Sequence, residues 1–189
     1  MNKLRSTLSF GKILTEDDIE TFLSAFEIQI LKANDYVKKS GTVSSEIAFV
    51  NEGILRIFDT TDAGSEVTKY FVRSGQFVAE LESYYSGIPT EEAIQAVTDS
   101  EIFVIKKSAV EKLSTQISSL YLFLKSMTES TLLNKLKDNN FLNYGSAETK
   151  YMEFVKRYPE LALNVPQQMI ASYLKITPQS LSRIRKNLK

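Results

Sequence analysis

Two side chains near the C-terminal end, Gln179 and Arg183, have the chemistry to recognise the edges of DNA base pairs. A glutamine amide both donates and accepts hydrogen bonds and suits adenine, whereas an arginine guanidinium can bind guanine O6 and N7 together. Because the two residues are four positions apart, a helix would place them on the same face. The basic side chains around them are suited to phosphate contacts. The hydroxyl side chains are suited to phosphate contacts or to capping the start of that helix. The expected DNA-binding set is therefore Thr177, Gln179, Ser180, Arg183, Arg185 and Lys186.

The spacing of the apolar residues in this segment predicts two short helices that pack against each other. Aliphatic residues stand at Ile170, Leu174, Ile176, Leu181 and Ile184, with the small Ala171 where two crossing helices must approach closely. Thr177-Pro178 predicts the start of the second helix, since a hydroxyl caps the first turn and proline fits the first helical position. The pattern is typical of a helix-turn-helix. The alternative is an ordinary helical hairpin with a solvated basic tail.

The charges of the chain are divided unevenly. The whole sequence is neutral, with 23 basic and 23 acidic residues. Residues 165–189 carry five basic residues and no acidic one, so the remainder has 23 − 5 = 18 basic against 23 acidic residues. A neutral protein with one basic end indicates that polyanion binding is confined to that end.

Composition excludes several other classes of function. The chain has no cysteine and no histidine, which excludes disulfides, thiolate metal sites and the commonest general base. Asp, Glu, Lys or Ser could still catalyse a reaction, but we find no nucleophile–base pair and no phosphate-binding glycine loop. We expect a binding protein that is not an enzyme and has no cofactor or metal. Neither a membrane span nor a signal peptide is indicated, so we expect a cytoplasmic location.

The first 112 residues predict a helix followed by a small antiparallel barrel. Thr15 and the acidic residues after it are typical of a helix start, and the helix is expected over about 15–25. Alternation of apolar and polar residues then predicts seven or eight short strands, with turns at Asn51-Glu52-Gly53 and Asp62-Ala63-Gly64. We therefore expect an α+β fold with an N-terminal antiparallel β-roll or jelly roll over residues 1–112.

A long helix is expected next, over residues 113–144, with a helix-turn-helix domain over 145–189. The long helix is apolar on more than one side, which predicts two partners: its own barrel and a second copy of the chain. The alternative is a helix buried within one domain. The residues expected to contact the second copy are Ile117, Leu120, Leu124 and Met127.

This order of elements resembles the CRP/FNR family of bacterial transcription regulators. The similarity is carried by residues 47–58 (IAFVNEGILRIF), 74–81 (SGQFVAEL) and 170–188, which includes TPQSLSRIRK at 177–186. The resemblance implies a homodimer on roughly palindromic double-stranded DNA, with half-sites about 34–36 Å apart. It further implies that Gln179 and Arg183 meet bases. RNA polymerase and a small-molecule effector are further candidate partners.

The family's cyclic-nucleotide pocket is altered in this sequence. Where relatives that bind cyclic AMP have glycine and glutamate, this chain has Ala79 and Glu80, and Thr90 and Glu91 stand where those relatives have Arg-Ser or Arg-Thr. An anion among carboxylates is repelled, so we do not expect control by cyclic AMP. A small ligand of another kind would be expected beside Glu80, Leu81, Thr90 and Glu91. Glu80 could equally make a structural hydrogen bond, and control by a protein partner or by abundance alone stays open.

Two further features concern the C-terminal segment. Lys175 occupies the turn position where many helix-turn-helices have glycine, and positive φ there would strain a lysine by about 1–2 kcal/mol, so we expect a slightly reshaped turn. The sequence ends at Lys189, so we expect no β-hairpin after the second helix. The competing function is a ligand-sensing or protein-interaction β-roll whose helix-turn-helix does not bind DNA.

Overall fold

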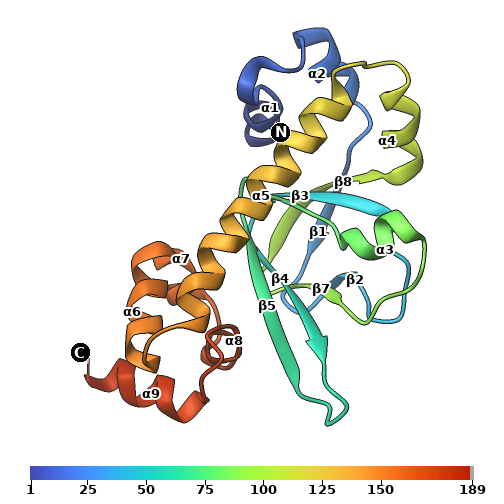
Figure 1. The fold of residues 1–189 in the computed structure, drawn as a ribbon. Helices are drawn as coiled ribbons and strands as arrows, with labels where there is room; N and C mark the ends of the chain where they lie inside the picture. The colour runs from blue at the N-terminus through green and yellow to red at the C-terminus, as the bar shows by residue number, and fades with distance from the viewer. Residues whose placement is uncertain (188–189) are drawn as a thin grey trace.

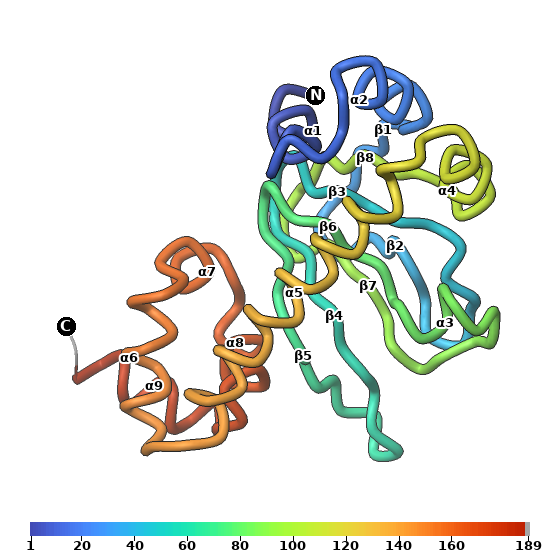
Figure 2. The backbone as a smooth tube through the Cα atoms, turned by 45° about the horizontal axis from the view of Figure 1, so that its top comes forward, coloured from blue at the N-terminus to red at the C-terminus, as the bar shows by residue number. Residues whose placement is uncertain are grey.

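A computed structural model describes residues 1–187 and has the α+β fold expected from the sequence. Figure 1 shows a β-roll, a long helix that runs along it, and a group of short helices at the far end of that helix. The tube in Figure 2 shows the same arrangement of the roll, the long helix and the C-terminal helices from a second direction. Leu188 and Lys189, which belong to the predicted basic segment, lie outside the described residues.

The roll consists of two four-stranded antiparallel sheets. One sheet has the order β1-β8-β3-β6 and the other the order β2-β7-β4-β5. An apolar cluster that includes Val50, Leu55 and Ile102 fills the space between them. The strands are β1 (Glu27–Leu31), β2 (Tyr36–Lys38), β3 (Glu46–Glu52), β4 (Ile54–Thr60), β5 (Glu66–Arg73), β6 (Phe77–Val78), β7 (Ala93–Ala96) and β8 (Ser100–Lys106).

The turn between β3 and β4 requires glycine. Gly53 has φ 94°, and a Cβ atom there would lie 2.7 Å from the Asp99 carbonyl oxygen, which is too close for any side chain. The predicted turn at Asn51-Glu52-Gly53 is therefore confirmed, together with the reason for its residue type.

Short helices cover the outer face of the first sheet. Helix α2 (Glu16–Leu23) begins after Thr15, whose side chain accepts from the Asp18 N–H in a capping box, as the sequence predicts. Helix α1 (Asn2–Leu8) and the 3-10 turn η1 (Phe10–Lys12) are additional elements that the sequence pattern did not predict. Leu4 and Leu8 of α1 are fully buried, so tertiary packing holds this helix in place.

The long helix begins later than predicted. Helix α4 (Lys107–Ser114) is followed by a break, and helix α5 starts at Leu120 and ends at Asn143. The break contains Thr115, Ser118 and Ser119, whose side chains compete for backbone hydrogen bonds and so lower helix propensity.

The predicted dimer-contact residues, at and just before the start of α5, face the roll of their own chain. Ile117 and Leu120 are 4% and 0% exposed, inside the apolar cluster formed with α1 and α2. Leu124 and Met127 pack against the same cluster. These four residues therefore bind the roll of their own chain. The apolar side chains of α5 that are exposed by more than half are Tyr121, Leu122, Leu132, Leu133 and Leu136.

Four helices follow α5. They are α6 (Ala147–Arg157), α7 (Pro159–Asn164), α8 (Gln167–Tyr173) and α9 (Pro178–Asn187). Ser146 caps α6 by accepting from the Thr149 N–H, and Pro159 begins α7 at its first position. Among residues 1–187, no helix combines the length and apolar character needed to cross a bilayer.

Candidate functional site

Helices α8 and α9 form a compact unit with a buried aliphatic centre. Ile170, Ala171, Leu174 and Leu181 are fully buried, and Ile184 is 9% exposed. The Thr177 hydroxyl accepts from the Ser180 N–H at 3.1 Å, so the predicted cap is confirmed. These contacts fix the angle between the two helices.

The turn between these helices keeps the conformation that glycine usually supplies. Lys175 has φ 55°, the positive φ that glycine usually supplies there, so the expected reshaping of the turn is not seen. The Ile176 N–H bonds to the Ala171 carbonyl at 3.0 Å across the turn. The Lys175 ammonium donates to Asn143 Oδ1 at 2.9 Å, which ties the turn to the end of α5. The backbone at this lysine is therefore strained, because the turn keeps the positive φ.

The outer face of α9 presents long polar side chains to solvent. Gln179, Arg183 and Lys186 are exposed, while Ser180 and Arg185 are half-buried. The Ser180 hydroxyl lies 2.9 Å from that of Thr177, so part of its hydrogen-bonding capacity is used within the chain.

A shallow groove of about 650 Å³, wide open to solvent, lies on this face, and residues from both helices line it. It includes Gln167 and Gln168 from the start of α8, and Ser182 from α9. The sequence interpretation did not select these three residues. Their signal was available, because Pro166 marks the start of a helix whose first N–H groups have no partner within the helix. The lining residues are Gln167, Gln168, Pro178, Gln179, Ser182, Arg183 and Lys186.

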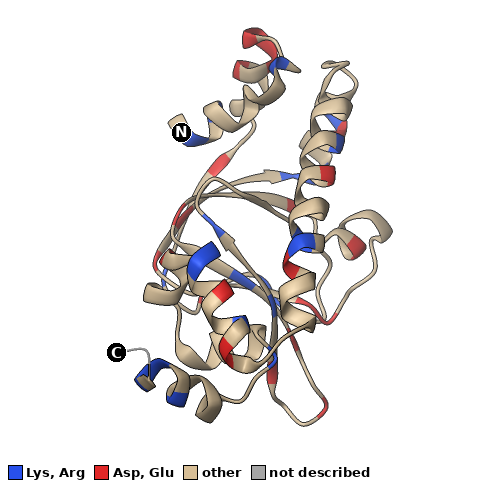
Figure 3. Ribbon diagram, turned by 60° about the vertical axis from the view of Figure 1, so that its left-hand side comes forward, with Lys and Arg blue, Asp and Glu red and all other residues tan. Residues whose placement is uncertain are grey.

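Charge is unevenly distributed over the molecule. Between residues 161 and 187 the sequence contains Lys175, Arg183, Arg185 and Lys186 and no acidic residue. Figure 3 shows basic residues along α9 at the C-terminal end, whereas acidic residues occur over the roll and its hairpin. The face that bears Gln179 and Arg183 is therefore also the basic face.

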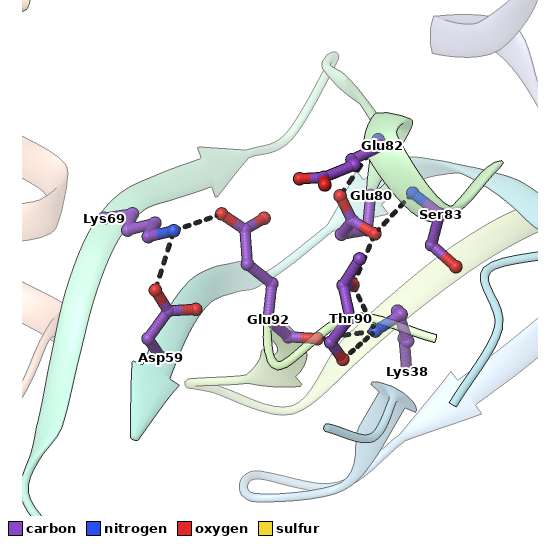
Figure 4. Close-up of polar contacts among 8 residues, drawn as sticks. All are labelled: Lys38, Asp59, Lys69, Glu80, Glu82, Ser83, Thr90 and Glu92. Carbon is purple, nitrogen blue, oxygen red and sulfur yellow. Dashed lines mark hydrogen bonds and ion pairs between the residues drawn. The ribbon is translucent and has the colours of Figure 1, made fainter. Parts of the chain in front are cut away.

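A second polar cluster lies in the roll, around Glu80 (Figure 4). The Glu80 side chain is only 3% exposed. Its carboxylate accepts from the N–H groups of Glu82 and Ser83 at 3.0 and 2.9 Å, and from the Thr90 hydroxyl at 2.6 Å. It thereby caps α3 (Leu81–Ser86), a helix that the sequence pattern did not predict. These contacts support a structural role for Glu80, the alternative to a ligand contact.

Two lysines complete this cluster. Lys38 is only 6% exposed. Its ammonium donates to the Glu92 carbonyl at 2.7 Å, and to the carbonyl and the hydroxyl of Thr90 at 3.2 Å each. Burial lowers the pKa of Lys38, against the opposing effect of nearby carboxylates. Burial would also lower the pKa of Lys69, but its bonds to Asp59 and Glu92 outweigh that effect and raise it. The Glu80 carboxylate, the Thr90 hydroxyl and both ammonium groups thus have partners within the chain.

The remaining predicted ligand residues lie at the edge of this cluster. The Leu81 side chain is 39% exposed, and the exposed Glu91 carboxylate accepts from the Ser40 hydroxyl at 2.7 Å. Of the four residues expected around a ligand, only Glu80 and Thr90 are brought into direct contact. Lys38, Lys69 and Glu92 were not selected from the sequence, because strand pairing places them there.

Comparison with known proteins agrees with this architecture. Residues 28–116 match the family model described as cyclic nucleotide-binding domain. No curated protein matches the chain in sequence.

Several solved structures share the fold over most of their length. FixK2 from Bradyrhizobium japonicum is 19% identical, with a TM-score of 0.71, over 86% of this chain and 84% of its own. The regulator CLP from Xanthomonas campestris is 18% identical, with a TM-score of 0.71, over 92% and 91% of the two chains. A Eubacterium rectale protein described as a transcriptional regulator of the CRP/FNR family is 14% identical, with a TM-score of 0.74, over 97% and 87%.

These comparisons confirm the fold that the resemblance implied, including the helices beyond the roll. Residues 28–116 therefore match the cyclic nucleotide-binding domain family model, and the chain as a whole has the fold seen in solved CRP/FNR transcription regulators.

Proposed function

We propose that this protein is a sequence-specific DNA-binding transcription regulator, and not an enzyme. The observation that carries the proposal is the exposed row of Gln179, Arg183 and Lys186 on one face of α9, beside a groove lined by α8. The amide and the guanidinium are the groups that recognise base edges in the major groove, and the ammonium suits phosphate.

The dimensions of this unit support the proposal. A helix of ten residues, such as α9, is about 15 Å long. The major groove of B-form DNA is about 12 Å wide and admits one helix. The N–H groups at the start of α8, beside Gln167 and Gln168, would meet the phosphate backbone next to that groove. The fold shared with regulators such as CLP, described as a global regulator, agrees with this role.

We further propose that two copies pair through the exposed face of α5. Leu133 and Leu136 follow Leu122 by about three and about four turns, so the three side chains lie on nearly the same side of the helix. Parallel pairing there would set two α9 helices on successive turns of a roughly palindromic site.

The dimer has a direct test with a matched control. Leu136→Lys should halve the mass measured by light scattering at micromolar concentration, from about twice 21.4 kDa to that of one chain. Leu163→Lys, on the 83% exposed Leu163 of α7, should leave the mass unchanged. A monomeric wild-type protein would refute the pairing.

We also propose that cyclic AMP does not control DNA binding. Each oxygen of Glu80 is engaged in capping α3 or binding Thr90, and an entering phosphate would face Glu80 and Glu92 in a partly desolvated space. Calorimetry with millimolar cyclic AMP should detect no binding. Saturable binding that also raises DNA affinity would overturn this part of the proposal. A contact with RNA polymerase remains a prediction from the resemblance.

Selection of bound fragments from random DNA tests the main proposal. The wild-type protein should enrich a two-part motif, and its affinity for that motif should fall steeply with salt, as phosphate contacts require. The absence of enrichment, together with no salt-sensitive duplex binding at micromolar protein, would refute it. In that case a pull-down through the roll would test the alternative of a protein-interaction module.

A further inference from the structure

Helix α8 also makes a direct contact with the β-roll. Strand β5 lies at the edge of its sheet, so one side of its backbone has no neighbouring strand. The Ser172 hydroxyl of α8 accepts from the Thr68 N–H at 2.9 Å and donates to the Glu66 carbonyl at 3.2 Å. One side chain thus satisfies a donor and an acceptor on the free edge, which would otherwise be open to another strand.

The next residue of α8, Tyr173, joins three parts of the molecule. Its ring, 4% exposed, has centroid distances of 5.3 Å to Phe71 of β5, 6.4 Å to Phe141 of α5 and 5.8 Å to Phe154 of α6. Its hydroxyl donates to Asp138 Oδ2 of α5 at 3.3 Å. Aromatic contacts of this geometry restrict both the distance and the tilt of the helices that make them.

Asp138 of α5 makes the other polar contacts where α5, α6, α8 and β5 meet. Its carboxylate accepts from the Tyr158 hydroxyl at 2.5 Å and from the Arg157 guanidinium at 3.5 Å, both at the end of α6. The Arg73 guanidinium at the end of β5 lies 4.8 Å from the centroid of the Tyr158 ring. Asp138 therefore holds α6 and α8 against α5, next to the same edge strand.

These contacts fix the orientation of the C-terminal helices relative to α5, because the short link between α5 and α6 does not. Only residues 144–146 join α5 to α6, and they include Gly145 with φ 92°. A three-residue link with glycine allows many directions of the helices that follow. The buried residues between α8 and α9 make those helices one body, so whatever fixes α8 also fixes α9.

We propose that Ser172 and Asp138 are positioning residues that set the direction of α9 relative to α5 and the roll. In the dimer, which rests on the proposed function, this direction determines the distance between the two recognition helices. Neither side chain lines the groove beside α9. Their loss should therefore relax the preferred spacing of the two DNA half-sites and leave the recognition of each half-site unchanged.

The first test measures affinity for duplexes whose two half-sites are separated by one base pair more or fewer than the optimum. The double variant Ser172→Ala, Asp138→Asn should reduce the wild-type penalty for wrong spacing by about tenfold, with the affinity for a single half-site unchanged. Ser114→Ala, which removes a hydroxyl–carbonyl bond within α4, is the control and should keep the wild-type profile. A double variant with the wild-type profile would overturn the proposal.

A second test does not depend on DNA. Because the chain has no cysteine, spin labels can be placed at Lys39→Cys on the roll and Ser182→Cys on α9, with labelled chains diluted into unlabelled protein. The distance distribution should be narrow in the wild-type background and clearly broader in the double variant. An equally broad wild-type distribution would overturn the positioning role. If the distribution is narrow but the unlabelled wild-type protein binds no DNA, the proposed function fails and the positioning of α9 stands.

Discussion

The cluster around Glu80 in the β-roll and the outer face of α9 are both rich in polar side chains. The two regions differ in whether those side chains bond within the chain or extend into solvent. Around Glu80 the carboxylates, hydroxyls and ammonium groups are bound to one another within the chain. On α9 the side chains of Gln179, Arg183 and Lys186 extend into solvent beside a groove. The first region therefore contributes to folding, whereas the second is free to bind something else.

This difference gives a rule for separating the two regions by mutation. Substitutions in the Glu80 cluster should change the free energy of unfolding and leave DNA affinity per folded molecule unchanged. Substitutions on the outer face of α9 should do the reverse. The following predictions test the rule, from the largest expected effect to the smallest.

Glu80→Ala should lower the free energy of unfolding by about 3 kcal/mol, since it removes a helix cap and leaves buried donors unpaired. Urea unfolding followed by circular dichroism measures this loss. Glu82→Ala, at the exposed neighbouring residue, should stay within about 0.5 kcal/mol of the wild type. A neutral Glu80→Ala would show that the carboxylate is not needed to cap α3.

Arg183→Ala should weaken binding to the selected motif by about 1–3 kcal/mol, because a guanidinium that binds guanine O6 and N7 provides that much discrimination. Gel-shift titrations on the motif and on a scrambled duplex would separate lost specificity from lost charge. Lys112→Ala, an exposed residue of α4, serves as the control. Equal loss on both duplexes would show that Arg183 contacts phosphate only.

Lys175→Gly should raise the free energy of unfolding by about 1 kcal/mol, since glycine adopts φ 55° without the strain of a side chain. The bond to Asn143 is lost in this variant, which keeps the gain small. Lys137→Gly, within α5, should instead cost about 1 kcal/mol. DNA affinity should not change in either variant, and a destabilised Lys175→Gly would show that the bond to Asn143 outweighs the strain.

Lys186→Ala should have the smallest effect on DNA affinity. The loss should be similar on every DNA sequence. A single phosphate contact changes the slope of log affinity against log salt by about 0.9. Titrations at three salt concentrations would measure this slope. An unchanged slope would place Lys186 away from the DNA backbone.

The helix-turn-helix was predictable because its signals are local. The cap at Thr177, the apolar spacing through Leu181 and the charge asymmetry all lie within one short segment, and the structure places the helices where these signals indicate. The turns at Gly53 and Gly64 and the expectation of seven or eight short strands rest on equally local signals, although the short strands β2 and β6 were not located from the sequence.

The parts that could not be predicted depend on contacts distant in sequence. Helices α1 and α3 are short and are held by burial of Leu8 and by the Glu80 cap. The periodicity of α5 showed that two of its faces are apolar, but it could not show which face meets the roll. Ile117 and Leu120 were therefore assigned to the dimer, although they lie in the core of their own chain.

The uneven division of charge has a consequence for how fast the protein finds DNA. Residues 1–164 carry 18 basic and 23 acidic residues, and the basic side chains of α9 stand at one end of the molecule (Figure 3). In the field of a duplex such a dipole experiences a torque that turns the basic end forward before contact. We expect most encounters at low ionic strength to begin in a productive orientation, and the association rate to fall as salt removes this bias.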